Sequence, residues 1–179
     1  SFFLVLFYNN WDSCSGAMNT VLTNRLGDFF IFVFFSTSIF SGLSFLSYSF
    51  LFFSSSFFLI YTAFTKSAQF PFSGWLPKAM SAPTPVSSLV HSSTLVTAGL
   101  LLIFNFSLML MNSYLITLIF FSGLFTVFFS SLSAILEEDL KKVVALSTLS
   151  QMGFSMTTFG LGISFISLLH LLSHALFKS

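Results

Sequence analysis

Three long stretches of this chain contain no aspartate, glutamate, lysine or arginine, and they constrain the fold more than any other feature. They run from Phe29 to Thr65, from Ala79 to Leu136 and from Val143 to Phe177. Charged residues make up only 6% of the chain, whereas about a quarter is usual in soluble domains. A helix of about 20 apolar residues crosses a membrane, so each stretch accommodates at least one span and the middle stretch two. The chain is therefore predicted to be an all-α polytopic membrane protein.

Polar and helix-breaking residues divide the chain into predicted spans. Residues 1–8 are expected to be the last turns of a helix, and further spans are predicted at 16–41, 48–69 continued by 74–80, 84–106, 114–136, 141–162 and 163–179. The apolar pattern is still running at both ends, so we expect an internal fragment with a single transmembrane domain (1–179). A formal net charge of +1 provides no basic surface for nucleic acid, and membrane lipids are the expected surroundings.

The stretch from Lys66 to Gly99 interrupts the regular succession of spans. It holds all the prolines of the chain, which are Pro71, Pro77, Pro83 and Pro85. Pro71 has no backbone donor and disfavours a helical conformation at Phe70, so we predict a discontinuous helix broken at about Phe70–Pro77. Irregular backbone at membrane depth must be buried in protein or line water, and broken helices of this kind form ion sites in transporters.

Lys66 lies at the end of the first half of this broken helix. One interpretation is structural, because a lysine can extend its amine to the membrane surface or interact with the negative end of a helix. The other is a proton carrier, because burial disfavours the charged amine and an acidic neighbour favours it. Arg25 and Asp28, three residues apart in a predicted span, either form a structural ion pair or bias the charge of such a lysine.

Three titratable residues near the end of the sequence form a second group. His170, His174 and Lys178 are spaced four apart and share one face of a predicted helix, which favours a water-lined proton wire. Histidines at this spacing also bind metals, but no cysteine or carboxylate lies nearby in the sequence, so no metal is expected. His91, two turns into the span 84–106, is either a satisfied polar residue or a relay.

A cluster of charges separates the last two complete apolar runs. It consists of Glu137, Glu138, Asp139, Lys141 and Lys142. Such a cluster belongs at a membrane surface, and the order of acids before lysines predicts Asp139 as the N-cap of the following helix.

The run KSAQFPFSGWLPKAMSAPTPVSSLVHSSTLVTAG from Lys66 to Gly99 resembles the signature of the NADH dehydrogenase subunit 5 family, the distal antiporter-like subunit type of respiratory complex I. Further matches are NRLGD at 24–28, EEDLKKVVALSTLSQMG at 137–153 and HLLSHALFK at 170–178. They follow the family's order and spacing over essentially the whole chain. The resemblance implies an antiporter-like transmembrane helix bundle containing a broken helix.

The resemblance also implies site residues. Lys66 matches the family's central lysine and Asp28 the acidic residue of the preceding helix, with Arg25 and Pro71 in supporting positions. His91 matches the histidine of the following helix. His170, His174 and Lys178 match polar residues that lead toward a second half-channel. The family's partner glutamate for the lysine is expected just before Ser1.

These matches imply a proton-translocating core subunit of complex I, part of NADH:ubiquinone reductase. Electron transfer through NADH, FMN, iron–sulfur clusters and ubiquinone is expected in other subunits, with no cofactor in this chain. The expected partners are other membrane-arm subunits, especially the subunit 4 type. The expected location is the mitochondrial inner membrane, with a bacterial plasma membrane as the alternative.

Two other functions are kept open by the sequence. Multi-subunit cation/proton antiporters share most of the Lys66–Gly99 stretch, so the chain could belong to such an antiporter. Alternatively, it is a purely structural membrane-arm subunit whose buried charges only fix the register of the helices.

Overall fold

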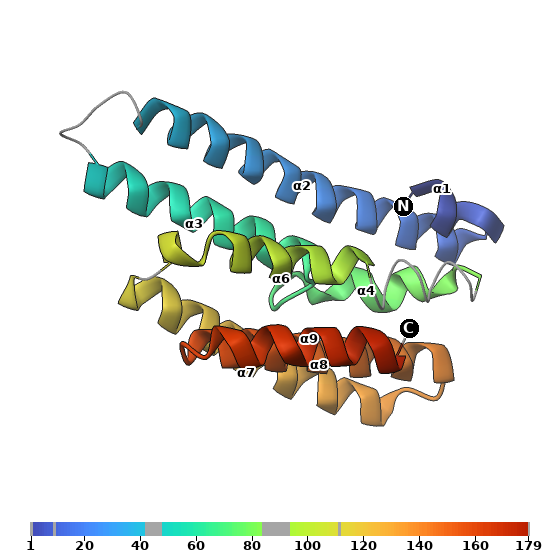
Figure 1. The fold of residues 1–179 in the computed structure, drawn as a ribbon. Coiled ribbons are helices and arrows are strands. Elements are labelled where there is room, and N and C mark those ends of the chain that lie inside the picture. Colours follow the sequence, from blue (N-terminus) through green and yellow to red (C-terminus); the bar gives the residue numbers. More distant parts are fainter. Residues whose placement is uncertain (1, 9, 42–47, 84–93, 111, 179) are drawn as a thin grey trace.

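The computed structural model describes residues 2–8, 10–41, 48–83, 94–110 and 112–178. Every element within these ranges is helical, which confirms the predicted all-α class (Figure 1). The elements are α1 (Phe2–Val5), η1 (Leu6–Tyr8), α2 (Trp11–Ser41), α3 (Tyr48–Lys66), η2 (Phe72–Gly74), α4 (Trp75–Lys78), η3 (Ala79–Ser81), α6 (Leu95–Asn105), η5 (Ser107–Leu110), α7 (Ser113–Leu136), α8 (Leu140–Gly160) and α9 (Ser164–Lys178).

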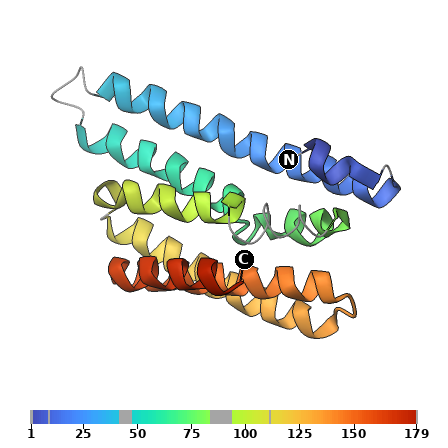
Figure 2. The ribbon, with the colours of Figure 1, turned by 45° about the vertical axis from the view of Figure 1, so that its right-hand side comes forward.

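The long helices lie side by side in an elongated bundle (Figures 1 and 2). The most extensive helix contacts are those of α7 with α8 and of α2 with α3, while α6 packs on α3 and α9 folds back on α8. The core between these pairs is apolar and includes the buried side chains of Leu59, Leu76, Leu100 and Met152. Helix α4, which follows the break, contacts both α2 and α8, so the break lies between the two helix pairs.

Helix α7 is, within the described ranges, the one helix long and apolar enough by itself to cross a membrane. Large apolar side chains cover its outer surface, among them Phe121, Phe128 and Leu132, which are all exposed. A continuous apolar surface of this kind suits contact with lipid or with a neighbouring membrane helix.

The helix break starts with a capped turn at the carboxyl end of α3. The Gln69 N–H donates to the Phe64 carbonyl at 2.9 Å, and Ala68 before it has a φ of 55°, in the left-handed region. This is the hydrogen-bond pattern of the Schellman motif, which ends many helices. Helix α3 therefore ends at Lys66 through its own backbone geometry.

The prolines follow this helix end rather than cause it. The sequence predicts an end near Gln69 because of Pro71, but α3 stops at Lys66 and irregular backbone continues to Pro71. The Trp75 indole N–H donates to the Thr65 carbonyl at 3.3 Å, so α4 satisfies one acceptor in the last turn of α3. As a result, Lys66 is the last residue of α3, and the irregular segment follows it directly.

Some other helices begin at different residues than predicted. Helix α2 begins at Trp11, not at residue 16, because the Cys14 N–H and the Ser13 hydroxyl both donate to the Asn10 carbonyl at 2.9 and 2.7 Å. Asp12 then lies in the first turn, where a negative charge is favourable. Residues 84–93, which include the start of the predicted 84–106 span, lie outside the described residues.

The later helices lie close to their predicted ranges. The turn between α8 and α9 is a second Schellman motif, in which Gly162 has a φ of 83° and the Ile163 N–H donates to the Thr158 carbonyl at 3.2 Å. Asp139 occupies the N-cap position of α8 without a side-chain cap hydrogen bond. The predicted N-cap position of Asp139 is confirmed, and its carboxylate pairs with Lys142 at 2.9 Å instead of bonding to the helix N-terminus.

Candidate functional site

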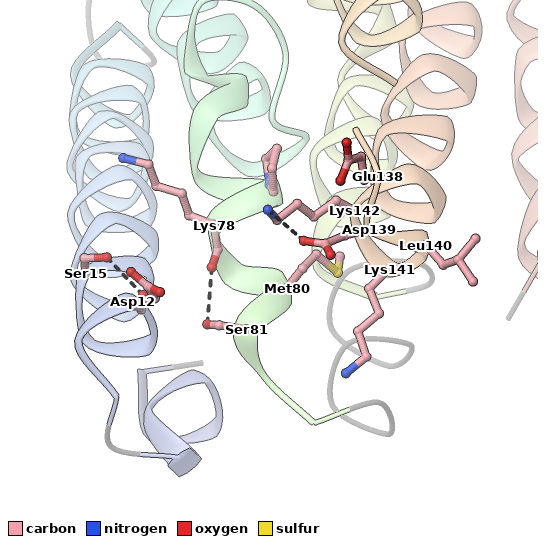
Figure 3. Close-up of a pocket in the computed structure, with 11 residues that line it drawn as sticks. Asp12, Ser15, Lys78, Met80, Ser81, Glu138, Asp139, Leu140, Lys141 and Lys142 are labelled. Atoms are coloured by element: carbon pink, nitrogen blue, oxygen red, sulfur yellow. Dashed lines mark hydrogen bonds and ion pairs between the residues drawn. The ribbon is translucent and has the colours of Figure 1, made fainter. Parts of the chain in front are cut away.

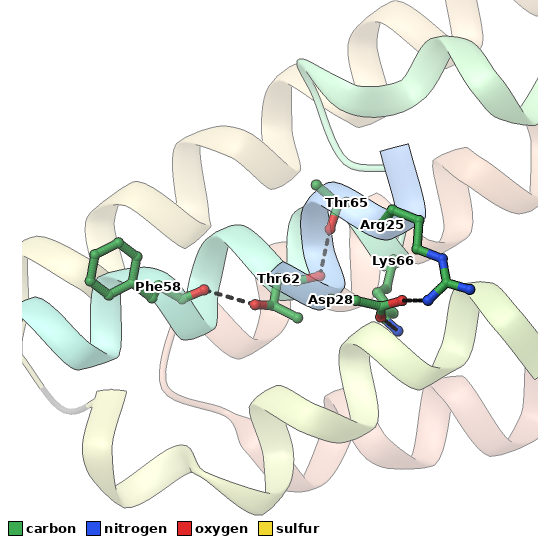
Figure 4. A network of polar contacts seen from close by, with 6 residues as sticks. All are labelled: Arg25, Asp28, Phe58, Thr62, Thr65 and Lys66. Atoms are coloured by element: carbon green, nitrogen blue, oxygen red, sulfur yellow. Dashed lines mark hydrogen bonds and ion pairs between the residues drawn. The ribbon is translucent and has the colours of Figure 1, made fainter. Parts of the chain in front are cut away.

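Asp28 of α2 and Lys66 of α3 form an ion pair beside the helix break. The Lys66 Nζ donates to Asp28 Oδ1 at 2.6 Å, and Arg25 Nη1 lies 3.7 Å from Asp28 Oδ2 (Figure 4). The Lys66 and Asp28 side chains are 28% and 30% exposed, whereas that of Arg25 is 79% exposed. The carboxylate therefore has a close, half-buried partner in Lys66 and a more distant, exposed one in Arg25.

Local packing brings these two helices together at the pair. Gly27 lies against Thr65, and a Cβ at Gly27 would overlap the Thr65 hydroxyl. That hydroxyl donates to the Thr62 carbonyl at 2.9 Å, within its own helix (Figure 4). The absence of a side chain on Gly27 thus allows the close approach that places the neighbouring Asp28 within reach of Lys66.

A cavity of about 640 Å³ opens beside the ion pair. Asn24, Arg25, Asp28 and Lys66 provide its polar lining. Both polar side-chain atoms of Asn24 are buried, and neither has a hydrogen-bond partner within the described part of the chain. Buried amides are normally paired, so this side of the pair has unused capacity for water or another polar group. Asn24 is part of the NRLGD match, but its sequence position alone indicated no role for it.

The group on α9 is held by two residues of α8. Gln151 Oε1 lies 3.0 Å from His170 Nε2, and the Lys178 Nζ donates to the Ser147 Oγ at 2.6 Å. The Ser147 hydroxyl in turn donates to the Val144 carbonyl at 2.8 Å, so its lone pairs face the amine. Gln151 and Ser147 were not predicted, although their spacing of four on α8 matches one helical face.

His174 lies between these two anchored residues on α9. Both of its ring nitrogens are buried, and neither has a hydrogen-bond partner among the described residues. It lines a cavity of about 400 Å³ together with His170 and Lys178. An imidazole that lacks a fixed partner can both accept and donate a proton, which suits a middle position in a relay.

Gln69 and Thr126 connect the break to α7. Gln69 is fully buried, and the Thr126 hydroxyl lies 2.8 Å from its Oε1 and 2.7 Å from the Gly123 carbonyl, sharing one proton between the two acceptors. This contact could not be expected from the sequence, because it joins residues 57 positions apart.

The charge cluster forms the polar end of the bundle. Lys142 pairs with Asp139 at 2.9 Å and lies 3.7 Å from Glu137. Lys142 and Asp139, together with Asp12 and Lys78 from the other side, line an open cavity of about 900 Å³ (Figure 3). This arrangement fits the predicted position at a membrane surface.

The remaining predicted site residues are distributed as follows. Pro71 is exposed within the break, and His91 lies outside the described residues. Lys66 pairs with α2 while the α9 residues contact α8, so the two predicted groups remain on different helix pairs. Among the described residues, no group of three or more His, Cys, Asp or Glu side chains could hold a metal ion.

Comparison with known proteins adds to this geometry. The transmembrane family described as NADH:quinone oxidoreductase/Mrp antiporter matches residues 1–179. The chain is 75% identical over 179 residues to the NADH-ubiquinone oxidoreductase chain 5 of Ascaris suum and 73% identical over 179 residues to that of Caenorhabditis elegans. These alignments cover 100% of this chain but 33% and 34% of the relatives, so it spans about a third of their length. They confirm the resemblance to the subunit 5 family.

A solved structure supports the same assignment. The structure of an Mrp complex from Dietzia sp. DQ12-45-1b matches with a TM-score of 0.90 and 30% identity, covering 99% of this chain and 21% of that chain. The predicted antiporter-like helix bundle is thereby confirmed. The chain belongs to the transmembrane family of NADH:quinone oxidoreductases and Mrp antiporters.

Proposed function

We propose that this chain is part of a proton-translocating core membrane subunit of NADH:ubiquinone reductase. The observation that carries the proposal is the 2.6 Å ion pair between Lys66 and Asp28 beside a helix break. The chain contributes no redox chemistry, and electron transfer from NADH to ubiquinone takes place on other subunits. Its relatives named NADH-ubiquinone oxidoreductase chain 5 support this assignment over the whole chain.

The proposed mechanism uses the ion pair as a proton switch. While Asp28 contacts Lys66, its negative charge stabilises the ammonium form of the lysine. Separation of the pair leaves a half-buried ammonium without its close partner, and Lys66 then releases its proton. When the lysine moves away, Arg25, which lies 3.7 Å from the carboxylate, becomes the ion-pair partner of Asp28. The unpaired amide of Asn24 orients water in the cavity between them.

The proton then passes toward the group on α9, with His91 as an intermediate relay. Gln151 and Ser147 hold His170 and Lys178, so these two groups keep fixed positions on either side of His174. His174 transfers the proton between them. This alternation of hydrogen-bonded and unpartnered groups supports a proton relay over a set of independent polar residues.

The proposed partners are other membrane-arm subunits, including a neighbour of the subunit 4 type. The proposed location is the mitochondrial inner membrane, as a multi-pass protein. In the proposed division of labour this chain moves protons only, and the redox cofactors bind to other subunits. The names and animal sources of the relatives support both proposals.

A subunit of a multi-subunit cation/proton antiporter is the second candidate. The TM-score of 0.90 with the Mrp complex supports keeping this candidate, since the fold accommodates either coupling. Dependence of proton movement on NADH oxidation supports the first candidate. Proton movement driven by a sodium gradient alone supports the second.

Replacement of Asp28 tests the switch. In the complete complex in lipid vesicles, Asp28→Asn should lower the number of protons translocated per electron, because the amide lacks the charge that stabilises the Lys66 ammonium. Asp12→Asn on the same helix is the matched control, because Asp12 is exposed at the polar end of the bundle. Equal ratios in the two variants would remove Asp28 from the mechanism.

Gln151 is predicted to position His170. Gln151→Leu should slow coupled proton translocation by about fivefold, the kinetic equivalent of the ~1 kcal/mol that one neutral hydrogen bond contributes. Gln151→Glu keeps an acceptor for His170 and should restore most of the rate. Ser150→Ala, one residue away, is the control. A Gln151→Leu complex with the unaltered rate, or one that Gln151→Glu does not improve upon, would contradict this role.

A further inference from the structure

Gln69, in the irregular segment between α3 and α4, takes part in three short hydrogen bonds. Its backbone N–H donates to the Phe64 carbonyl at 2.9 Å, and its backbone carbonyl accepts from the Phe72 N–H at 2.7 Å. Its side-chain Oε1 accepts from the Thr126 hydroxyl of α7 at 2.8 Å. The two backbone bonds shape the break, and the side-chain bond attaches it to a distant part of the chain.

The attachment of the break to α7 depends on side chains, because α3 and α7 make little direct backbone contact in the described ranges. The Phe70 ring, which is 40% exposed, stacks on Phe129 with the ring centroids 5.2 Å apart. Ring pairs are favourable at centroid separations of about 4.5–7 Å, whereas a hydrogen bond weakens beyond about 3.2 Å. The buried Gln69–Thr126 bond therefore fixes the break against α7 more exactly than the stacked rings do.

Thr126 lies where α7 and α8 pack closely. A Cβ at Gly153 of α8 would overlap the Thr126 hydroxyl and lie 3.1 Å from the Val127 nitrogen. A Cβ at Gly123 would lie 2.9 Å from the Thr157 nitrogen. Glycines that let two helix backbones approach this closely give a rigid interface, so we expect α7 and α8 to move as one unit.

The same helix pair holds the titratable group on α9. Gln151 and Ser147 of α8 are the partners of His170 and Lys178, at 3.0 and 2.6 Å. The α7–α8 unit is thus bonded to the break on one side and to the α9 group on the other. Gln69 connects the backbone next to Lys66 with this unit.

Stability alone does not explain a glutamine at this position. Gln69 is fully buried, and an apolar side chain would fill the position without the cost of burying an amide. The Thr126 hydroxyl does not require the glutamine either, because it also lies 2.7 Å from the Gly123 carbonyl. A buried polar contact in an apolar interface does, however, specify one register, as a buried asparagine does in coiled coils at a cost in stability.

We propose that Gln69 is a positioning residue, which through its bond to Thr126 fixes the irregular segment, and with it the end of α3 that carries Lys66, in one register against the α7–α8 unit. Gln69 carries no proton in this role. Lys66 precedes it by three residues, so a shift of the break would displace the lysine relative to Asp28 and to the α9 group. This inference rests on the proposed function of Lys66, which makes its position matter.

Hydrogen exchange tests the attachment without reference to pumping. Thr126→Val retains the shape of the side chain but has no hydroxyl to donate to Gln69. In the complete complex, the backbone amides of residues 67–74 should exchange about fivefold faster in Thr126→Val, the factor that corresponds to one neutral hydrogen bond. Unaltered exchange in this variant would overturn the proposal.

Two further variants control the exchange measurement. Thr126→Ser keeps the hydroxyl and should restore most of the slow exchange. Thr148→Val removes a hydroxyl that is buried as well but donates to the Ala145 carbonyl of its own helix at 2.6 Å. Faster exchange of residues 67–74 in Thr148→Val, to the extent seen in Thr126→Val, would show a general loosening of the bundle and contradict the specific attachment.

A double-mutant cycle tests the consequence for proton movement. Gln69→Met and Thr126→Val should each lower the rate of coupled proton translocation per assembled complex, on the order of fivefold. The double variant should be no slower than the slower single variant, because both changes remove the same bond. Thr126→Ser should restore most of the rate. Effects that multiply in the double variant, or a Thr126→Ser complex as slow as Thr126→Val, would overturn the positioning role.

The outcomes separate this proposal from the proposed function. If Lys66→Met lowers proton translocation while Gln69→Met and Thr126→Val do not, the positioning role is wrong and the role of Lys66 stands. If Lys66→Met has no effect, the proposed function is wrong, and the positioning of a proton carrier by Gln69 is wrong with it. Loss of translocation in all three variants, with rescue by Thr126→Ser, supports both.

Discussion

Gly99→Val should prevent the complete complex from assembling. Helix α6 crosses the last turn of α3 at this glycine, and a Cβ would lie 2.6 Å from the Ala63 carbonyl oxygen and 2.8 Å from the Ser67 nitrogen. Both are backbone atoms, so neither can rotate away as a side chain would. They are also hydrogen-bonded to each other at 2.8 Å, in the turn that leads into the break.

The expected cost of this substitution is large because it affects three features at once. Overpacking in a tightly packed interior typically costs about 1–3 kcal/mol, and here it also disturbs the end of α3 and the position of Lys66 next to it. The measurement is the amount of assembled complex in membranes, determined by native gel electrophoresis. Ala98→Val is the control, since Ala98 is exposed on the same helix. Assembly of Gly99→Val at the level of Ala98→Val would contradict the described contact of α6 with α3.

The helices could be predicted from the sequence because each depends on a local run of apolar residues. Apolar runs without charges must form spanning helices, and the predicted intervals 114–136 and 141–162 lie close to α7 and α8 for this reason. The first residues of the helices were less predictable where polar residues form the first turn. At the start of α2, the Asn10 carbonyl accepts two hydrogen bonds, which draws Trp11 and Asp12 into the helix instead of a connecting loop.

The end of α3 shows that a proline in the sequence does not by itself locate the end of a helix. Pro71 indicated a break, but the left-handed conformation of Ala68 ends the helix before the proline is reached. Alanine gives no sequence signal for this conformation, which glycine usually adopts. This early end of α3 affects the site, because it makes Lys66 the last residue of the helix.

The site residues were identifiable by type, but their partners were not. An ionisable residue in an apolar span must find a polar partner, so Lys66, Asp28 and His170 stand out in the sequence. Which residues pair depends on the crossing of helices, which Gly27 and Thr65 determine for the Asp28–Lys66 pair. Neutral partners such as Gln151 and Gln69 could not be distinguished from the other polar residues of the spans.

Lys66→Met should have the largest effect on proton translocation of the substitutions that leave the complex assembled. Methionine retains the length and apolar stem of lysine but carries no proton. Asp28 remains 30% exposed and keeps Arg25 at 3.7 Å, so its charge is not left isolated. We therefore expect the complex to assemble and to transfer electrons, with the loss confined to proton movement.

Lys78→Met is the matched control for this substitution. Lys78 is the last residue of α4, in the same broken helix, and is exposed at the polar end of the bundle. The two variants remove the same group from a half-buried and an exposed position. A general effect of lost positive charge would appear in both.

The decisive measurement is the number of protons translocated per electron by the complete complex in sealed vesicles, for Lys66→Met beside Lys78→Met. If the Asp28–Lys66 pair carries protons, the ratio falls in Lys66→Met and remains at the unsubstituted value in Lys78→Met. A full ratio in an assembled Lys66→Met complex would contradict this account and leave the ion pair as a structural link between α2 and α3.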